Sequence, residues 1–282
     1  MSLWREQKHV AIEIATDASG FAWGAVVEGQ QLHDRWPTSD SRPIHLKETD
    51  ALIHTIQAFQ NQFRDKRVDA LVDNQALVLA WCKQSCKDIA FNSLLKQLFQ
   101  LVSSLNCDLV LKYVPSAKNP ADAPSRRISL QDARLSSKAW ARLQALFGPH
   151  TFDLMAISAN AMHDLSGVTL PFYSPCPLPL SAGVNVLCQS LTSQHNYYCF
   201  PPFCMVGPVV AFLLKECSNC IKVTLVVPKL NPMPYWWPLL LNRALSVVSL
   251  GQSDESDIIE APSHKGYIPY KLRSELLAFR LQ

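Results

Sequence analysis

Residues 10–20 read Val-Ala-Ile-Glu-Ile-Ala-Thr-Asp-Ala-Ser-Gly. The apolar run at 10–15 predicts a β-strand, and Asp17 follows it at the point where that strand would end. A rigid strand would hold such a carboxylate at the edge of a sheet, and Gly20 begins the return to a second strand. A strand that ends in a fixed acid is therefore the starting point for the fold of the first half.

The following hundred residues alternate between strand and helix patterns. The expected strands are 10–15, 21–27, 31–36, 68–72 and 109–114, and the expected helices are 45–63, 75–82 and 92–104. Pro115 ends the last of these strands. Three early strands followed by alternating helices and strands predict a mixed sheet with helices packed against it.

Three further acids fall at matching places in this scheme. Asp73 ends the strand at 68–72, and Asp122 follows the last strand. Glu48 lies one helical turn before Leu52 on the apolar face of its helix, so it points toward the sheet. If the first and fourth strands are parallel neighbours, Asp17 and Asp73 lie side by side, and we predict that all four carboxylates converge.

Four converging carboxylates repel one another unless cations bind between them. Two divalent ions about 3.5–4 Å apart would turn the cluster into a phosphodiester hydrolysis site. Oxygen ligands favour Mg²⁺ or Mn²⁺ over zinc. Taken singly, each acid is equally well a turn residue, a first-turn helix acid or a loop cap. The order and placement of all four together is the specific feature.

The motifs that carry these acids resemble those of the ribonuclease H domain that follows reverse transcriptase in retroelements, with DIRS-like elements the nearest likeness. They are Thr-Asp-Ala-Ser at 16–19, Leu-Lys-Glu at 46–48, Val-Asp-Asn at 72–74 and Asn-Pro-Ala-Asp-Ala-Pro-Ser-Arg at 119–126. The last resembles the family pattern Asn-x-x-Ala-Asp-x-Leu-Ser-Arg, with one residue fewer after Asn119 and with Pro124 in place of Leu.

This resemblance implies an α/β fold with a ribonuclease H-like mixed sheet and flanking helices. It also implies an endonuclease that uses two Mg²⁺ or Mn²⁺ ions to hydrolyse the RNA strand of an RNA–DNA hybrid. Asp17, Glu48, Asp73 and Asp122 would be both catalytic residues and metal ligands. The expected substrate-binding residues are Ser19, Asn74, Arg126 and Arg127, although the two arginines are equally well a surface pair in a linker.

Two features leave other functions open. No histidine lies between Cys107 and Asp122, where many ribonucleases H place one that assists product release. No polymerase domain precedes the nuclease motifs, and we expect one as a missing partner. The alternative is a catalytically inactive relict, or a domesticated binding module of the same fold. Strand-transfer enzymes of this fold usually use three acids, and actin-like ATPases need glycine-rich phosphate loops that this sequence lacks.

Prolines crowd the second half, for which we expect a smaller α/β domain. We predict a ribonuclease H-like domain at 1–128, a linker helix within 129–150, a proline-rich domain at 151–250 and a tail at 251–282. The expected strands are 152–157, 197–200 and 223–227. The expected helices are 136–147, 182–191, 205–215, 236–244 and 272–281, the last being a short helix in the tail.

The segment at about 147–238 resembles the methyltransferase-like segment that follows ribonuclease H in DIRS-like elements. The matching pieces are Phe-Asp-Leu-Met-Ala at 152–156, Phe-Pro-Pro-Phe at 200–203 and Leu-Val-Val-Pro at 225–228. Such methyltransferases use Asp or Asn before Pro-Pro to accept a hydrogen bond from the adenine amino group. Phe200 occupies that place and cannot accept one, so we expect a degenerate, non-catalytic domain.

The cysteines permit a second kind of metal site. Cys199, Cys204, Cys217 and Cys220 have a C-x4-C-x12-C-x2-C spacing that could bind zinc, although buried thiols are the plainer account. The formal net charge of +3 gives no basic stripe. Residues 1–10 show no secretory signal and no long apolar run occurs, so we expect an intracellular protein, cytoplasmic or nuclear, without a membrane partner.

Overall fold

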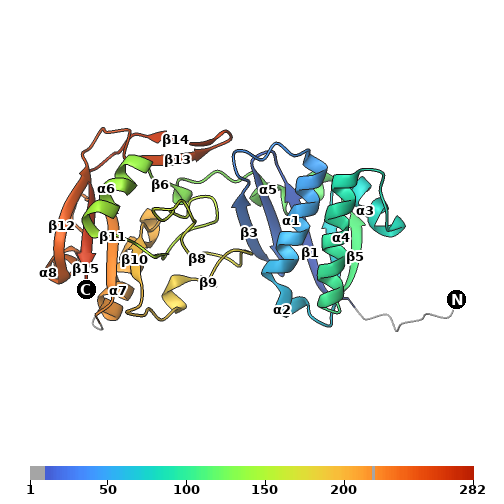
Figure 1. Ribbon diagram of the computed structural model, residues 1–282, viewed down its shortest axis with the longest axis horizontal. Helices are drawn as coiled ribbons and strands as arrows, with labels where there is room; N and C mark the ends of the chain where they lie inside the picture. Colours follow the sequence, from blue (N-terminus) through green and yellow to red (C-terminus); the bar gives the residue numbers. More distant parts are fainter. Residues whose placement is uncertain (1–9, 218–219) are drawn as a thin grey trace. The chain divides into compact units, whose positions relative to one another are not determined.

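The computed structural model describes residues 10–217 and 220–282 and divides into two compact units (Figure 1). One unit holds the residues up to Arg127 together with Cys176–Leu180, and the other holds Ile128–Pro175 and Ser181–Gln282. The prediction that the sequence has no secretory signal concerned residues 1–10, and residues 1–9 lie outside the described part. No helix of the described residues combines the length and the apolar character needed to cross a membrane.

The first unit is built on a five-stranded sheet in the order β3-β2-β1-β4-β5. Its strands are β1 (Val10–Ala18), β2 (Ala22–Val27), β3 (Gln30–Arg35), β4 (Arg67–Val72) and β5 (Asp108–Tyr113). β1, β2 and β3 are antiparallel neighbours, whereas β4 runs parallel to both β1 and β5. The predicted α/β fold, a mixed sheet with flanking helices, is confirmed.

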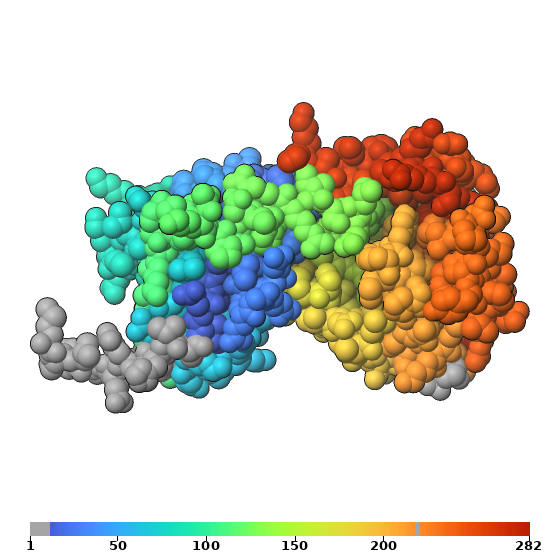
Figure 2. Space-filling model, turned by 180° about the vertical axis from the view of Figure 1, so that it is seen from behind, coloured from blue at the N-terminus to red at the C-terminus, as the bar shows by residue number. Residues whose placement is uncertain are grey.

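Helices flank both faces of this sheet. They are α1 (Ile44–Ala58), α2 (Gln60–Phe63), α3 (Gln75–Lys83), α4 (Ile89–Ser104) and α5 (Asp122–Ser125), with a 3-10 turn η1 (Ser116–Lys118) before α5. α1 and α4 lie side by side over one face, where each buries an apolar stripe that includes Leu52 and Leu98. Viewed from behind, the segment that contains α5 lies in green against the blue of β1–β3 (Figure 2). The helix expected at 45–63 is interrupted at Phe59.

The second unit is also α/β, and it is no smaller than the first. Its main sheet has the order β12-β15-β11-β10-β7, with a three-stranded sheet β14-β13-β6 and a pair β8-β9 beside it. The strands are β6 (Arg134–Leu135), β7 (Phe152–Asp153), β8 (Tyr173–Ser174), β9 (Gly183–Val184), β10 (Asn196–Cys199), β11 (Lys222–Pro228), β12 (Ala244–Gly251), β13 (Ile259–Ser263), β14 (Gly266–Tyr270) and β15 (Leu276–Leu281). The helices are α6 (Ser137–Phe147), α7 (Val206–Glu216) and α8 (Trp237–Arg243), with 3-10 turns η2 (Leu130–Asp132), η3 (Val186–Cys188) and η4 (Phe203–Met205).

Three predictions for the second half were wrong. The helix expected at 272–281 is the strand β15, which pairs with β11 on one side and β12 on the other. Both sides of this apolar segment are taken up by backbone hydrogen bonds of the sheet, and a short apolar run does not distinguish that from a helix. The helix expected at 182–191 is β9 followed by η3, with Asn185 at a φ of 56° between them. The strand expected at 152–157 ends after Asp153.

Candidate metal centre

Three carboxylates of the first unit converge. Asp17 lies near the end of β1, Glu48 near the start of α1, and Asp73 directly after β4. Each offers one carboxylate oxygen, and these oxygens lie within 4.8 Å of one another. Among the residues that the structure describes, no other three His, Cys, Asp or Glu side chains come together in this way.

The sheet register places the first two of these acids. β1 and β4 run parallel, and Ala15 pairs with Leu71. Asp17 and Asp73 each follow two residues later, so both come to the same level at the carboxyl ends of neighbouring strands. Glu48 reaches them from α1, which packs against β1. The prediction that acids at two strand ends and one helix start would meet therefore agrees with the geometry.

The fourth predicted acid, Asp122, does not join this group. Its Oδ1 accepts a hydrogen bond from Nε of Arg126 at 2.9 Å, one turn further along the chain. Asp122 is nevertheless close enough that its negative charge raises the pKa of Asp17. The structure thus gives three converged carboxylates and a fourth at the margin of the site, held by an arginine.

The short helix α5 is fastened to the sheet by several polar contacts. The Ser125 hydroxyl donates to the Asp17 carboxylate, and the Ser19 hydroxyl donates to the Ser125 carbonyl oxygen at 2.8 Å. The Asn119 side-chain amide donates to the Thr16 carbonyl oxygen at 2.9 Å. Nδ1 of His33 lies 2.7 Å from the Pro124 carbonyl oxygen. These contacts join the Asn119–Ser125 segment to β1, to the turn after β1 and to β3.

Gly24 of β2 allows this close approach. A Cβ at that position would lie 2.4 Å from the Ser125 backbone nitrogen and 2.6 Å from the Pro124 carbonyl carbon. Asp17 pairs with Gly24 across β1 and β2. The side-chain hydrogen bond from Ser125 to Asp17 therefore exists because a glycine on the neighbouring strand leaves room for α5.

Burial and mutual repulsion perturb the acids of the group. Burial, and then the charges of Asp73 and Asp122, raise the pKa of Asp17 to about 6 against the pull of the Ser125 hydrogen bond. Burial, and then the charges of Asp73 and Asp17, raise the pKa of Glu48 to about 7, while the Asn74 amide opposes the shift. A bound cation would relieve both effects, so the group is electrostatically suited to one.

The predicted substrate-binding residues occupy different kinds of position. Ser19 is only 6% exposed, and its hydroxyl accepts from the Ala22 backbone N–H as well as donating to Ser125. Asn74 caps α3 by accepting from the Leu77 N–H at 3.0 Å. Arg126 and Arg127 are both exposed. Ser19 and Asn74 thus support the acids from within the fold, and the arginines lie at the surface.

Three residues with a part in the site were not singled out from the sequence: Ser125, Asn119 and Lys47. All three belong to quoted motifs, which could have identified them. Lys47 is buried, and its ammonium donates to the carbonyl oxygens of Gly20 at 2.7 Å and Asp40 at 3.0 Å. Lys47 thus fixes the turn after β1. In the sequence, only its position next to Glu48 indicated a role near the site.

The cysteines expected as a possible zinc site do not converge in the described residues. Cys199 and Cys217 are buried, whereas Cys204 and Cys220 are exposed. The eleven residues of α7 separate Cys204 from Cys217 by about 16 Å of helix. The two pairs therefore lie at opposite ends of a helix, which excludes a shared tetrahedral ion in this arrangement.

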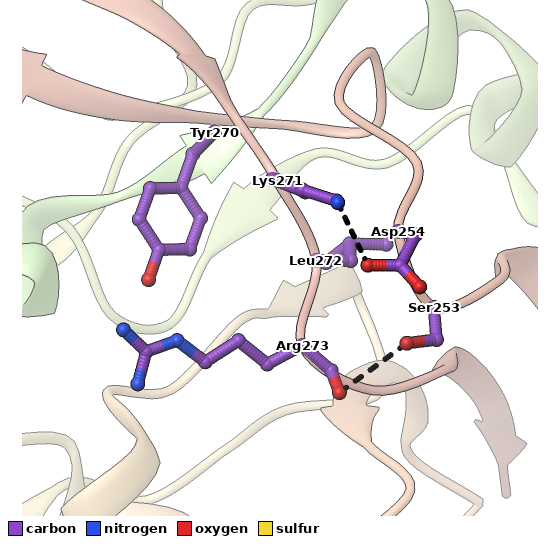
Figure 3. Close-up of a pocket in the computed structure, with 6 residues that line it drawn as sticks. All are labelled: Ser253, Asp254, Tyr270, Lys271, Leu272 and Arg273. Atoms are coloured by element: carbon purple, nitrogen blue, oxygen red, sulfur yellow. Dashed lines mark hydrogen bonds and ion pairs between the residues drawn. The ribbon is translucent and has the colours of Figure 1, made fainter.

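A surface cavity of about 450 Å³ in the second unit is lined by Ser253, Asp254, Tyr270, Lys271, Leu272 and Arg273 (Figure 3). Lys271 forms an ion pair with Asp254 at 3.0 Å, and the Ser253 hydroxyl donates to the Arg273 carbonyl oxygen at 3.4 Å. Both partners of the ion pair are largely exposed, so it is weak. No group of potential metal ligands lies there.

No family model and no curated protein matches this sequence. Among solved structures, RNase H1 from the halophilic archaeon Halobacterium salinarum NRC-1 is 20% identical, with a TM-score of 0.35 over 40% of this chain and 92% of that one. LC11-RNase H1 in complex with an RNA/DNA hybrid is 20% identical, with a TM-score of 0.34 over 39% and 91%. The N-terminal RNase H domain of rv2228c from Mycobacterium tuberculosis is 17% identical, with a TM-score of 0.33 over 40% and 89%.

The geometry by itself defines what the site can do. Three carboxylate oxygens from three separate elements meet, and two of these carboxyl groups have a raised pKa. The Arg126 guanidinium bonds to the neighbouring Asp122. Hard divalent cations prefer such oxygen ligands. The first unit thus presents a candidate metal centre at the carboxyl ends of two parallel strands.

Proposed function

We propose that the first unit is a metal-dependent endonuclease that hydrolyses the RNA strand of RNA–DNA hybrids. The observation that carries this proposal is the convergence of Asp17, Glu48 and Asp73 within 4.8 Å. Like charges at that separation have no reason to be gathered unless a cation binds between them. Asp122, whose negative charge raises the pKa of Asp17, is the proposed fourth ligand.

In the proposed site, Asp17, Glu48, Asp73 and Asp122 would hold two Mg²⁺ or Mn²⁺ ions. Such ions activate a water for attack on the phosphodiester and stabilise the leaving 3′ oxygen. The chain itself supplies the positioning. Ser125 fixes the Asp17 carboxylate, and Asn74 faces Glu48. Arg126 and Arg127 are the proposed contacts to substrate phosphates, to which guanidinium groups bind in a bidentate manner.

The choice of an RNA–DNA hybrid rests on the four sequence motifs and on their order. A structural neighbour was solved in complex with an RNA/DNA hybrid, which is consistent with the same substrate class here. We further propose that the chain derives from a DIRS-like retroelement, in which a polymerase domain would be its partner. The second unit would then be the methyltransferase-like segment, with Phe200 in place of the amino-group acceptor after β10.

The second candidate is an inactive module of the same fold that binds nucleic acid or protein. Two observations favour it. Asp122 is engaged by Arg126 rather than by the other acids. No histidine lies between Cys107 and Asp122 to assist product release. Both candidates share the fold and the acidic group, and they differ in turnover.

Cleavage of a labelled RNA–DNA hybrid in the presence of Mg²⁺ separates the two candidates. We expect the parent chain to cut the RNA strand and Asp73→Asn to lose at least 100-fold in rate, since removing a metal ligand removes most of the charge stabilisation in the transition state (about 3 kcal/mol or more). Asp65→Asn is the matched control, because Asp65 is an exposed residue of the same unit with a φ of 59°, which Asn tolerates. Equal cleavage by parent and Asp73→Asn would overturn the proposal, and no cleavage by the parent would favour the inactive module.

A further inference from the structure

The pairing of Asp122 with Arg126 gives the margin of the site a specific geometry. The two residues are four apart at α5, and Nε of Arg126 lies 2.9 Å from Oδ1 of Asp122. The Asp122 side chain is 38% exposed and the Arg126 side chain 59% exposed, so solvent reaches both. Exposed pairs of this kind are weak, and a stronger competitor can separate them.

The charges of two of the converged acids also act on Arg126. The hydrogen bond and charge of Asp122 come first among the causes that raise the pKa of Arg126, and the charges of Asp17 and Asp73 add to them. Arg126 is therefore a cation at the margin of the site, and its main partner is Asp122. A divalent cation bound between the acids would attract the Asp122 carboxylate more strongly than the single charge of the arginine does.

The backbone around Asp122 is fixed, and its side chain is not. The Asn119 amide holds the segment to β1, the Ser19 hydroxyl donates to the Ser125 carbonyl oxygen, and the Ser125 hydroxyl lies 2.9 Å from the Asp122 carbonyl oxygen. Because these contacts hold the backbone of the segment, rotation of the Asp122 side chain is the motion by which we expect its carboxylate to pass from Arg126 to a bound cation. Rotations of exposed side chains are fast.

We propose that Arg126 is a built-in counter-ion that holds Asp122 away from the acidic group until a divalent cation binds, whereupon Asp122 exchanges the guanidinium for the metal. This inference rests on the proposed function, because it takes the acidic group to be a metal site. It assigns Arg126 a role in metal uptake through Asp122. Arg126 is then a positioning residue, and its guanidinium is released as the metal binds.

Binding of Mn²⁺ to the full chain without substrate tests this exchange, measured by titration calorimetry and by the loss of the free Mn²⁺ EPR signal. Arg126→Gln removes the competitor, and we expect Mn²⁺ affinity to rise about two- to five-fold, as befits an exposed ion pair. Asp122→Asn lowers the affinity. In the double variant Arg126→Gln with Asp122→Asn, the gain from Arg126→Gln disappears, because Arg126 acts through Asp122.

Lys118→Gln is the matched control for general electrostatics, since it removes one positive charge from the loop that leads to α5. We expect its Mn²⁺ affinity to equal that of the parent. An unchanged or lower affinity in Arg126→Gln would overturn the inference. So would a gain that persists in the Asp122→Asn background or a gain of equal size in Lys118→Gln. Thermal unfolding of each variant checks that the fold is intact.

The same titrations tell this failure apart from failure of the proposed function. If Mn²⁺ binds the parent and binding is lost in Asp17→Asn, the metal site stands whatever Arg126 does. If the parent takes up no Mn²⁺, or Asp17→Asn binds it equally well, the metal site itself is refuted and the inference falls with it.

Discussion

Each unit buries a carboxylate at the end of a strand, but the groups around the two carboxylates differ. In the second unit, Asp153 at the end of β7 is 2% exposed, and its two oxygens accept from the backbone N–H groups of Met155 at 3.2 Å and Met162 at 3.3 Å. In the first unit, Asp17 is also 2% exposed, and the carboxylates of Glu48 and Asp73 lie beside it.

Burial alone raises the pKa of Asp153 to about 7, against the pull of the two backbone donors. A single buried carboxyl group can thus avoid an unfavourable buried charge by keeping its proton while it retains its backbone hydrogen bonds. Three carboxyls that meet cannot all be relieved in this way, because each charge also acts on the others. Convergence, rather than burial or a shifted pKa, is the feature that distinguishes a candidate metal centre from an ordinary buried acid.

The sharpest way to break this contrast is to displace α5 from the sheet with Gly24→Ala. The added Cβ would meet the backbone of Pro124 and Ser125, which cannot give way as a flexible side chain would. We expect the free energy of unfolding of the first unit to fall by about 3 kcal/mol and Mn²⁺ affinity to drop more than tenfold. Gly20→Ala is the control, because nothing lies within 4 Å of a Cβ there. Equal behaviour of the two variants in urea unfolding and Mn²⁺ titration would contradict the role assigned to α5.

Paired amide variants of the two buried acids sharpen the comparison. At pH 8 and without metal, Asp17→Asn removes a buried charge whose pKa is about 6, and we expect a gain of about 2 kcal/mol in the free energy of unfolding. Asp153→Asn also removes a buried charge, but one backbone N–H loses its acceptor, so the gain is smaller. Only Asp17→Asn should abolish the stabilisation that Mg²⁺ confers. If Mg²⁺ still stabilised Asp17→Asn, or no longer stabilised Asp153→Asn, the contrast between the two buried acids would be wrong.

The pH dependence of stability gives the mildest test. Asp17 and Glu48 keep their protons up to about pH 6 and about pH 7 in the folded state, against 3.8 and 4.5 in an unperturbed chain. The folded state binds more protons between about pH 4 and pH 7, so the free energy of unfolding of the metal-free protein falls as pH rises through this window.

Above pH 7, Mg²⁺ at one hundred times its Kd should raise the free energy of unfolding by about 2.7 kcal/mol. At pH 5 it should raise it hardly at all. Asp153 titrates near the same pH, but it adds equally with and without Mg²⁺, so the difference between the two unfolding curves reports the acidic group alone. A stabilisation by Mg²⁺ as large at pH 5 as at pH 8 would show that the ion binds elsewhere.

The local patterns that proved reliable were those with a clear period or a clear stop. The strand ending in Asp17 and the helix that carries Glu48 were predictable, because each alternates or repeats over enough residues to fix its type. The short apolar segment at 276–281 was not, since it fits helix and strand equally well until β11 and β12 pair with it. The helix expected at 182–191 failed because turn geometry at Asn185 outweighed its apolar content.

For the site, sequence patterns were enough to single out four acids as candidates and to place each roughly along its element. The fold was needed to show that Asp17, Glu48 and Asp73 meet, that Asp122 is held by Arg126, and that the four cysteines lie apart. The physical reason is that a strand or helix pattern fixes the direction of a side chain relative to its own backbone. The distance between side chains of different elements depends on sheet register and on close approaches such as that of α5 to Gly24.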